Sequence, residues 1–182
     1  MQSSIDVLLK NCKRGDEKSQ IQLYDRYCNA MFAIACRYLK NHEDAKDAVQ
    51  EGFLKAFQKL GTYSNDFSFG AWLKRIIINQ CLDTLKKKSV IEVTFNTEYL
   101  EVADDEDWNI DAEITREMVY VALEQLPLKY QLVLKLYLME GYDHEEVSQI
   151  LEIPIKTSRT QLRRGRLQLK ALLKKKYYEA GS

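Results

Sequence analysis

Apolar residues recur at helical spacing along most of this chain of 182 residues, outside one central stretch. The clearest pattern, NHEDAKDAVQEGFLKAFQKL at 41–60, predicts a helix with Asn41 as its N-cap. Its apolar stripe comprises Ala45, Ala48, Val49, Phe53, Ala56, Phe57 and Leu60. The preceding helix supplies a matching face with Tyr24, Tyr27, Met31, Phe32, Ile34 and Ala35. Because only seven glycines and two prolines interrupt the sequence, the pattern predicts an all-α fold.

A polar and aromatic loop separates this helix from the next one. The loop, GTYSNDFSFG at 61–70, has glycine at both ends, and Ser68 provides an N-cap for a helix over 69–88. The last turn of that helix is lysine-rich, which the helix dipole favours. The spacing directs five side chains inward, namely Trp72, Leu73, Ile76, Ile77 and Leu82.

The C-terminal third of the chain predicts four further helices. The first three patterns lie at 114–127, 128–142 and 143–154. The third begins with a capping-box pair, Asp143 and Glu146. A turn at EIPI, residues 152–155, leads into a final basic helix, so the last two helices predict a helix-turn-helix.

The net charge of zero conceals three segments of different sign. Residues 1–88 carry 15 Lys and Arg against 10 Asp and Glu, a net charge of about +5. Residues 89–113 carry nine acidic and no basic residues, and residues 114–182 carry 12 basic against eight acidic ones. We therefore predict two small helical domains, 1–88 and 114–182, joined by an acidic flexible linker at 89–113.

Candidate catalytic and metal chemistry is sparse in this sequence. The four cysteines form no CxxC pair, and His42 and His144 do not stand at metal-ligand spacing from them. Asp44, Asp47 and Glu51 form an acidic cluster, which a solvated or docking helix face explains better than a metal site. No phosphate-cradling glycine loop, histidine dyad or paired-carboxylate pocket is visible. We therefore expect no enzyme activity, no cofactor and no metal.

The sequence also bears on the compartment of the protein. Its longest apolar runs are far shorter than a membrane span, and its N-terminus lacks the layout of a signal peptide. Reduced thiols are the simplest interpretation of the four cysteines. We expect a cytoplasmic protein with no direct membrane insertion.

Basic and polar residues gather at the start of the last helix. Side chains at the N-terminal end of a recognition helix reach base edges, while flanking cations neutralise phosphates. Gln161 offers an amide for pairing with adenine, and the arginines suit guanine or phosphate. Leu162, Leu169, Leu172 and Leu173 hold the opposite face, and Lys174 to Lys176 are typical of a solvated face. The predicted DNA-binding set is Lys156, Thr157, Ser158, Arg159, Thr160, Gln161, Arg163, Arg164 and Arg166.

The loop at 61–70 and the helix after it combine aromatic, polar and cationic residues. Such a mixture suits single-stranded nucleic acid, because bases stack on aromatic rings while the backbone follows cations. Core packing explains Trp72 equally well, since its spacing with Ile76 places it on the inner face. Packing alone explains the loop residues less well, namely Tyr63, Ser64, Asn65 and Phe67.

Taken together, these motifs resemble a known family. The segment 41–60 resembles the DAEDLVQE-F helix of sigma-70 family transcription initiation factors, and FSFGAWLKRIIINQCLDTLKKK is similar to the F-AWL-RI--N---D-LR helix that follows it. The segment 126–166 resembles their region 4, and the size of the chain is similar to that of the extracytoplasmic function (ECF) group. The resemblance extends over nearly the whole chain.

The resemblance implies a promoter-specificity factor, monomeric when free, with no catalysis of its own. Region 4 would contact the polymerase flap and read the −35 element, the acidic linker would follow the RNA path, and an anti-sigma factor is an implied partner. The clamp helices of the largest subunit of bacterial core RNA polymerase would bind Asp44, Asp47, Gln50, Glu51 and Phe53. Promoter DNA at the −10 element, including a flipped base, would contact Tyr63, Ser64, Asn65, Phe67, Trp72, Lys74, Arg75, Asn79, Lys86, Lys87 and Lys88.

The final helix departs from the family pattern. The usual motif is GTVKSRL-RAR, whereas KTSRTQLRRGR places Lys156, Ser158 and Gln161 where glycine, valine and arginine are usual. We therefore carry over no base preference, and we expect the exchange at Ser158 to loosen the packing of the helix. Gly165 costs about 1 kcal/mol relative to alanine in a helix interior, which predicts a close approach at that position.

Two other classes of function are compatible with parts of the chain. A polymerase-independent helix-turn-helix regulator explains the C-terminal domain, but it leaves DAVQEGFLKAF and the aromatic loop without a role. An all-helical enzyme or adaptor is the third class, and no catalytic constellation supports it.

Overall fold

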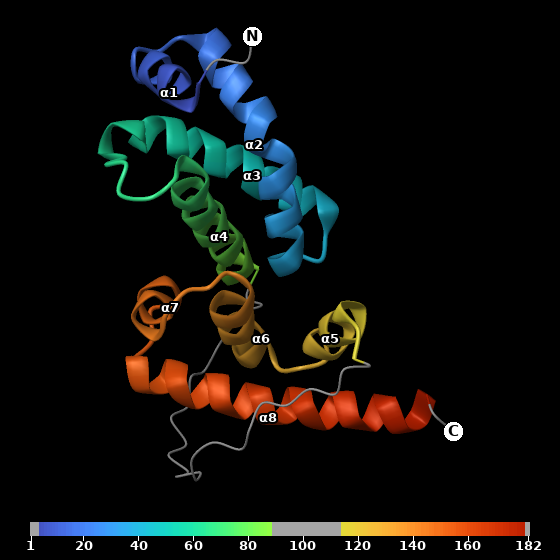
Figure 1. The fold of residues 1–182 in the computed structure, drawn as a ribbon. Helices are drawn as coiled ribbons and strands as arrows, with labels where there is room; N and C mark the ends of the chain where they lie inside the picture. Colours follow the sequence, from blue (N-terminus) through green and yellow to red (C-terminus); the bar gives the residue numbers. More distant parts are fainter. Residues whose placement is uncertain (1–3, 89–113, 181–182) are drawn as a thin grey trace. The chain divides into compact units, whose positions relative to one another are not determined.

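All regular structure in the described part of the chain is helical. A computed structural model of the protein describes residues 4–88 and 114–180, and every element within these ranges is an α-, 3₁₀- or π-helix. The chain divides into two compact units, unit 1 from Met1 to Glu92 and unit 2 from Val93 to Ser182 (Figure 1). The predicted linker at 89–113 lies outside the described residues, so the predicted domain boundaries stay a prediction.

Unit 1 contains four α-helices and a short 3₁₀ turn. They are α1 (Ile5–Lys13), α2 (Glu17–Tyr38), α3 (His42–Lys59), η1 (Leu60–Thr62) and α4 (Phe69–Lys87). Each α-helix begins after a residue whose side chain accepts a hydrogen bond from a backbone N–H of the first turn, namely Ser4, Asp16, Asn41 and Ser68. The sequence analysis predicts the caps at Asn41 and Ser68 and misses α1, which buries Leu8, Leu9 and Cys12.

The core of unit 1 lies where α3 packs against α2 and α4 (Figure 1). The predicted apolar stripe of α3 is confirmed, because all of its members except the half-buried Phe57 are buried. A Cβ atom added at Gly52 would lie 2.3 Å from Cδ1 of Ile77, so glycine permits the close approach of α3 and α4. On α4, Ile78 is fully buried, whereas Ile76, which was predicted to point inward, is only half-buried.

Unit 2 contains the other four α-helices. They are α5 (Arg116–Leu123), α6 (Leu128–Leu134), the π-helical turn η2 (Lys135–Met139), α7 (His144–Leu151) and α8 (Ile155–Ala180). The α8 helix packs across α5, α6 and α7 (Figure 1). Both bonds of the predicted capping box at Asp143 and Glu146 are present. The turn between α7 and α8 contains Glu152, whose φ of 57° is left-handed, and Ile155 already belongs to α8.

A close helix crossing explains Gly165, as the sequence predicts. A Cβ atom added there would lie 3.0 Å from Cδ1 of Leu134 and 3.2 Å from Cβ of Tyr130, so α8 approaches α6 over the glycine. The intrinsic cost of glycine in a helix is therefore offset by packing that a larger residue would disturb.

Among the described residues of unit 2, the charged side chain of Lys135 is buried. Lys135 is 3 % exposed, and its Nζ atom donates to Oε1 of Glu124 at 2.6 Å and to Oε1 of Gln131 at 3.3 Å. The Gln131 amide in turn donates to the carbonyl of Leu126 at 2.8 Å. This network ties α6 and η2 to the end of α5, because a buried ammonium requires a compensating carboxylate.

The four cysteines form no disulfide bond. Cys12, Cys28, Cys36 and Cys81 are all free thiols, and burial raises the pKa of Cys81 to about 12. Burial likewise raises the pKa of Cys12.

Among the helices of the described residues, none combines the length and the apolar character that crossing a membrane requires.

Candidate polymerase and nucleic-acid interfaces

One face of α3 carries an exposed stripe of polar residues. Asp47, Gln50 and Glu51 are all exposed and follow one another at helical spacing. Leu54 continues this stripe and is 58 % exposed, although it is a large apolar residue. Because protein interfaces combine apolar area with a polar rim, Leu54 and its polar neighbours suit contact with a protein.

The structure corrects the prediction for Phe53. Its side chain is only 2 % exposed, and its ring lies 4.7 Å from that of Tyr24 and 6.1 Å from that of Phe57. Phe53 belongs to the apolar stripe of α3, which faces the core, so the predicted contact with a partner is wrong. Leu54 was not among the predicted residues, although its helical phase places it outside the apolar stripe and so predicts its exposure.

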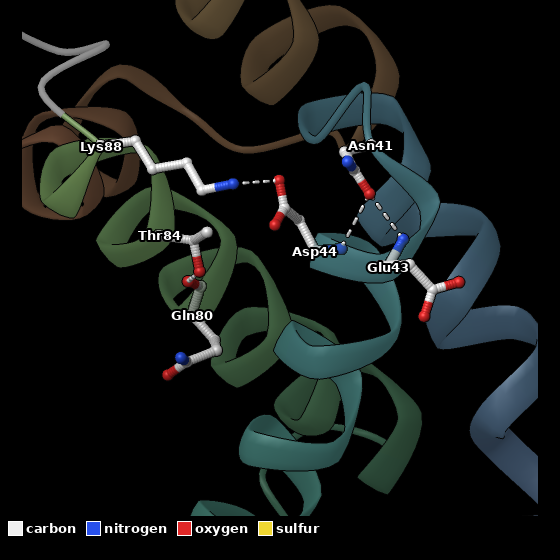
Figure 2. Close-up of polar contacts among 6 residues, drawn as sticks. All are labelled: Asn41, Glu43, Asp44, Gln80, Thr84 and Lys88. Atoms are coloured by element: carbon white, nitrogen blue, oxygen red, sulfur yellow. Dashed lines mark hydrogen bonds and ion pairs between the residues drawn. The ribbon is translucent and has the colours of Figure 1, made fainter.

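Asp44 lies at the start of α3 and is bound within unit 1. Its Oδ2 atom pairs with Nζ of Lys88 at 2.5 Å, which links the beginning of α3 to the end of α4 (Figure 2). The Asn41 side chain accepts from the backbone N–H groups of Glu43 at 2.8 Å and of Asp44 at 3.3 Å (Figure 2). The ion pair thus joins a residue predicted to bind polymerase to a residue predicted to bind DNA.

Three further polar contacts involve side chains of α4. Lys55 of α3 donates to Oε1 of Gln80 at 2.5 Å and lies 3.6 Å from the carboxylate of Asp83. The Thr84 hydroxyl donates to the carbonyl of Gln80 at 3.0 Å, within the same helix (Figure 2). Of the predicted DNA-binding residues on α4 and at its C-cap, Trp72, Lys74 and Arg75 are half-buried, whereas the exposed ones are Asn79, Lys86, Lys87 and Lys88.

The loop before α4 is organised around an aromatic cluster. The Tyr63 hydroxyl donates to the carbonyl of Phe67 at 2.7 Å, and its ring lies 5.7 Å from Phe69 and 5.4 Å from Trp72. Burial, followed by the charge of Asp6, raises the pKa of Tyr63, so the phenol remains a neutral donor. Tyr63 and Trp72 are therefore half-buried supports of the loop.

The remaining side chains of the loop point outward. Phe67 is 72 % exposed, and Ser64 and Asn65 are exposed beside it. Asn65 has a φ of 63°, a left-handed conformation that asparagine tolerates better than most residues. The Ser64 hydroxyl donates to a carboxylate oxygen of Asp66 at 2.5 Å. The loop thus presents an exposed aromatic ring, neutral polar groups and the exposed carboxylate of Asp66.

The start of α8 divides the predicted DNA-binding set into two faces. Lys156, Arg159 and Thr160 are exposed, while the half-buried members are Arg163, Arg164 and Arg166. The buried members are Thr157 at 9 %, Ser158 at 0 % and Gln161 at 6 %. The predicted pairing of Gln161 with adenine is therefore contradicted, because the helical repeat turns positions 157, 158 and 161 toward the other helices.

A contact between the two helices of the helix-turn-helix explains the buried serine. The Ser158 hydroxyl lies 2.9 Å from Nδ1 of His144, the first residue of α7. The side chain is fully buried and has a hydrogen-bond partner. The expected loosening of the packing at Ser158 stays a prediction. Burial, followed by the charges of Arg159 and Arg166, lowers the pKa of His144.

These surfaces suit non-covalent recognition. In the described ranges, 4–88 and 114–180, no group of three or more His, Cys, Asp or Glu residues is arranged to hold a metal ion. The exposed residues are instead acids and an amide on α3, an aromatic ring in the loop, and cations on α4 and α8. Such residue types contact a protein partner, single-stranded bases and phosphate groups.

Comparisons with known proteins identify the family of both parts of the chain. The Sigma-70 region 2 family matches residues 23–90, and the Sigma-70, region 4 family matches residues 116–169. The ECF RNA polymerase sigma factor SigW of Bacillus subtilis is 28 % identical, over 96 % of this chain and 99 % of its own. The ECF RNA polymerase sigma-E factor of Escherichia coli K12 is 27 % identical, over 88 % of this chain and 89 % of its own.

Solved structures share the fold. The sigma factor RpoE of Bartonella quintana, crystallised with the anti-sigma factor NepR, has a TM-score of 0.57 at 23 % identity and covers 84 % of this chain and 95 % of its own. CnrH, in complex with the cytosolic domain of CnrY, has a TM-score of 0.54 at 23 % identity and covers 92 % of this chain and 96 % of its own. From the family matches and the relatives, this chain belongs to the sigma-70 family of bacterial RNA polymerase sigma factors, within its extracytoplasmic function (ECF) group.

Proposed function

We propose that this sigma factor binds core RNA polymerase through the exposed stripe of α3 and reads promoter DNA with the loop before α4 and with α8. The observation that carries the proposal is that both kinds of surface are exposed on one chain, in segments that match regions 2 and 4. RNA synthesis belongs to the polymerase, and we assign no catalytic step to this chain.

The exposed polar stripe of α3 is the surface that we assign to the polymerase. Asp47, Gln50 and Glu51 offer acids and an amide to basic and polar groups, and Leu54 adds apolar area that water would otherwise cover. We assign the stripe to the clamp helices of the largest subunit, and unit 2 to the flap. Asp44 belongs to the edge of this surface, where Lys88 already neutralises part of its charge.

We assign α8 to duplex DNA at the −35 element. Lys156, Arg159 and Thr160 are the exposed side chains at its N-terminal end, where a recognition helix meets base edges. Arg163 and Arg164 follow one turn later and suit phosphate groups. Because such contacts displace counterions from DNA, we expect the affinity to fall steeply as salt rises.

We assign the loop before α4 to single-stranded DNA of the −10 element. Phe67 provides a ring on which a base can stack, and Ser64 and Asn65 provide hydrogen-bonding groups beside it. Tyr63 and Trp72 support the loop from behind. The backbone of the strand, or the edge of its duplex, would then follow Lys74, Arg75, Asn79, Lys86, Lys87 and Lys88.

Regulation by an anti-sigma factor is part of the proposal. The similar structures of RpoE and CnrH were solved with NepR and with the cytosolic domain of CnrY, respectively. An anti-sigma factor that covers the α3 stripe or α8 would keep this protein, a monomer when free, from polymerase or promoter. We place these events in the cytoplasm, where polymerase acts.

Run-off transcription tests the proposal. Purified bacterial core polymerase is supplied with genomic promoter fragments of the host, with and without this protein, and the transcripts are sequenced. We expect new start sites at a defined subset of fragments. The double variant Gln50→Ala with Glu51→Ala should lose these transcripts through loss of core binding. Gln22→Ala with Asp25→Ala is the matched control, because it removes an exposed amide and an exposed acid from α2.

The same assay, combined with duplex binding by the protein alone, distinguishes the roles of the DNA-binding surfaces and tests the rival function. Arg159→Ala with Arg163→Ala should abolish duplex recognition, whereas Lys174→Ala with Lys175→Ala removes the same charge from an exposed part of the same helix and should not. Phe67→Ala should reduce promoter opening more than duplex binding. No transcript with core polymerase, together with specific duplex binding by the protein alone, would replace the proposal by a polymerase-independent regulator.

A further inference from the structure

A histidine–serine contact connects the two helices of the helix-turn-helix. His144 is the first residue of α7, and its Nδ1 atom lies 2.9 Å from Oγ of Ser158 in the first turns of α8. Ser158 is completely buried, while His144 is half-buried at the edge of the contact. The pair therefore fixes the orientation of α8 on α7 at the level of the exposed Lys156, Arg159 and Thr160.

Charged and titratable groups surround the imidazole of His144. Arg159 and Arg166 act on it from α8, and Asp143 acts on it from the N-cap of α7. The ring of Tyr137 in η2 lies 4.7 Å from the imidazole, and the Arg166 guanidinium lies 5.7 Å from that tyrosine ring. Two arginines and one aspartate leave the surroundings positive, which disfavours a protonated histidine in the DNA-free protein.

The hydrogen bond with Ser158 persists when His144 gains a proton. A serine hydroxyl can both donate and accept, so it can donate to Nδ1 of a neutral ring or accept from Nδ1–H of a protonated ring. The protonated form makes the stronger contact, since one partner of the hydrogen bond is then charged. Protonation therefore strengthens the link between α7 and α8 and adds positive charge beside the exposed arginine.

We propose that His144 is a positioning residue that takes up a proton when phosphate groups dock on α8, so that DNA binding by unit 2 tightens as the pH falls. This inference rests on the proposed function of α8 as a DNA-binding helix. It assigns to His144 a role that acts through Ser158 and through the local charge, without a contact to a base.

The direction of the pH effect follows from the charges. In the DNA-free protein the pKa of His144 is lowered from its ordinary value of 6.5 by burial and by Arg159 and Arg166. A phosphate group beside Arg159 offsets the arginine charge and attracts the imidazolium, so DNA raises this pKa. By linkage, DNA affinity then rises as the pH falls through the pKa of the complex, and it levels off below the pKa of the DNA-free protein.

A histidine titration by NMR tests the proton uptake directly. The full chain contains only two histidines, and His42 is the matched reference because it is the first residue of α3 as His144 is of α7. Without DNA, we expect the pKa of His144 to lie below its ordinary value of 6.5. Addition of a mixed-sequence DNA duplex should raise the pKa of His144.

DNA binding by variants of the full chain tests the consequence. Fluorescence anisotropy with the same duplex, at constant salt from about pH 8 to about pH 5.5, should show an affinity gain of about three- to tenfold for the wild type. His144→Gln keeps an amide donor for Ser158 but cannot titrate, so its affinity should not change over this range. Ser158→Ala should weaken binding about three- to tenfold even at pH 8, because the recognition helix loses its anchor.

Each outcome decides one part of the inference. A flat pH profile for the wild type, or an equal gain for His144→Gln, would overturn proton uptake while leaving DNA binding by α8 intact. The control His42→Gln should retain the wild-type profile, and loss of the gain there would place the titrating group in unit 1. No salt-dependent DNA binding at any pH would overturn the proposed function together with this inference.

Discussion

Units 1 and 2 each contain a close helix crossing at a glycine, but they place their polar contacts differently. In unit 1, Asp44 and Lys88 form an ion pair with 23 % and 49 % of their side-chain surfaces exposed. In unit 2, Lys135 is 3 % exposed where it binds Glu124, and Ser158 is completely buried where it meets His144. This ion pair of unit 1 is therefore solvated, whereas these two contacts of unit 2 belong to its interior.

This difference decides which side chains are accessible to partners. Aliphatic and aromatic packing holds unit 1 together, so the acids of α3 and the lysines of α4 remain at the surface. Unit 2 uses part of its polar residues to fix its own helices, and α8 presents only those cations that the helical repeat directs outward. Substitution of a polar residue should consequently cost more stability in unit 2 than in unit 1.

The largest expected effect concerns the buried lysine of unit 2. Glu124→Gln removes the carboxylate that offsets the Lys135 ammonium, and we expect unit 2 to lose about 2–3 kcal/mol of its free energy of unfolding. Hydrogen exchange followed by mass spectrometry measures this loss unit by unit. Glu145→Gln, which removes an exposed acid from α7, is the control and should cost only a few tenths of a kcal/mol. Equal costs for the two variants would contradict a structural role for the buried pair.

The next effect concerns the glycine crossing of unit 1. Gly52→Ala places a Cβ atom 2.3 Å from Cδ1 of the fully buried Ile77, and such overpacking costs about 1–3 kcal/mol. Ile77→Val removes that Cδ1 atom, so the double variant should be more stable than Gly52→Ala alone. Gly61→Ala is the control, because no atom lies within 4 Å of its added Cβ. Failure of the valine to restore stability would show that the backbones themselves, and not Ile77, resist the methyl group.

A smaller effect is expected at the glycine crossing of unit 2. Gly165→Ala brings a Cβ atom to 3.0 Å from Leu134 and 3.2 Å from Tyr130, which is tight but less severe than the clash at Gly52. Alanine recovers about 1 kcal/mol of helix propensity, so we expect a net loss of at most about 1 kcal/mol in unit 2. Hydrogen exchange of α6 and α8 measures it, and a gain in stability would mean that α8 moves away from α6 at little cost.

The smallest effect concerns the surface ion pair of unit 1. Lys88→Ala and Asp44→Asn should each change the free energy of unfolding by less than about 1 kcal/mol, and their coupling should decrease further as salt is added. A double-mutant cycle on unit 1 gives the coupling energy. A coupling above about 2 kcal/mol would place this pair with the buried contacts of unit 2 and remove the contrast between the units.

Much of the local structure was predictable from the sequence. Asn41, Ser68 and the pair Asp143 and Glu146 identify helix starts, because their side chains satisfy backbone groups within three residues. The sequence pattern was misleading at two positions. Phe53 was assigned to both faces of α3, and Gln161 was predicted to be exposed although it is buried. The sequence analysis also missed α1, a helix of nine residues whose stability depends on packing against the rest of unit 1.

The sequence by itself determined the helical repeat, the helix caps, the order of the two sigma regions and the separation of charge along the chain. These properties are local, since they depend on residues a few positions apart. Only the tertiary structure decided that Ser158 binds His144 and that Lys88 binds Asp44. It also decided that α6 is the helix that approaches α8 closely at Gly165. Such contacts depend on which helix faces approach one another, and the chain distance between their residues carries no information about that approach.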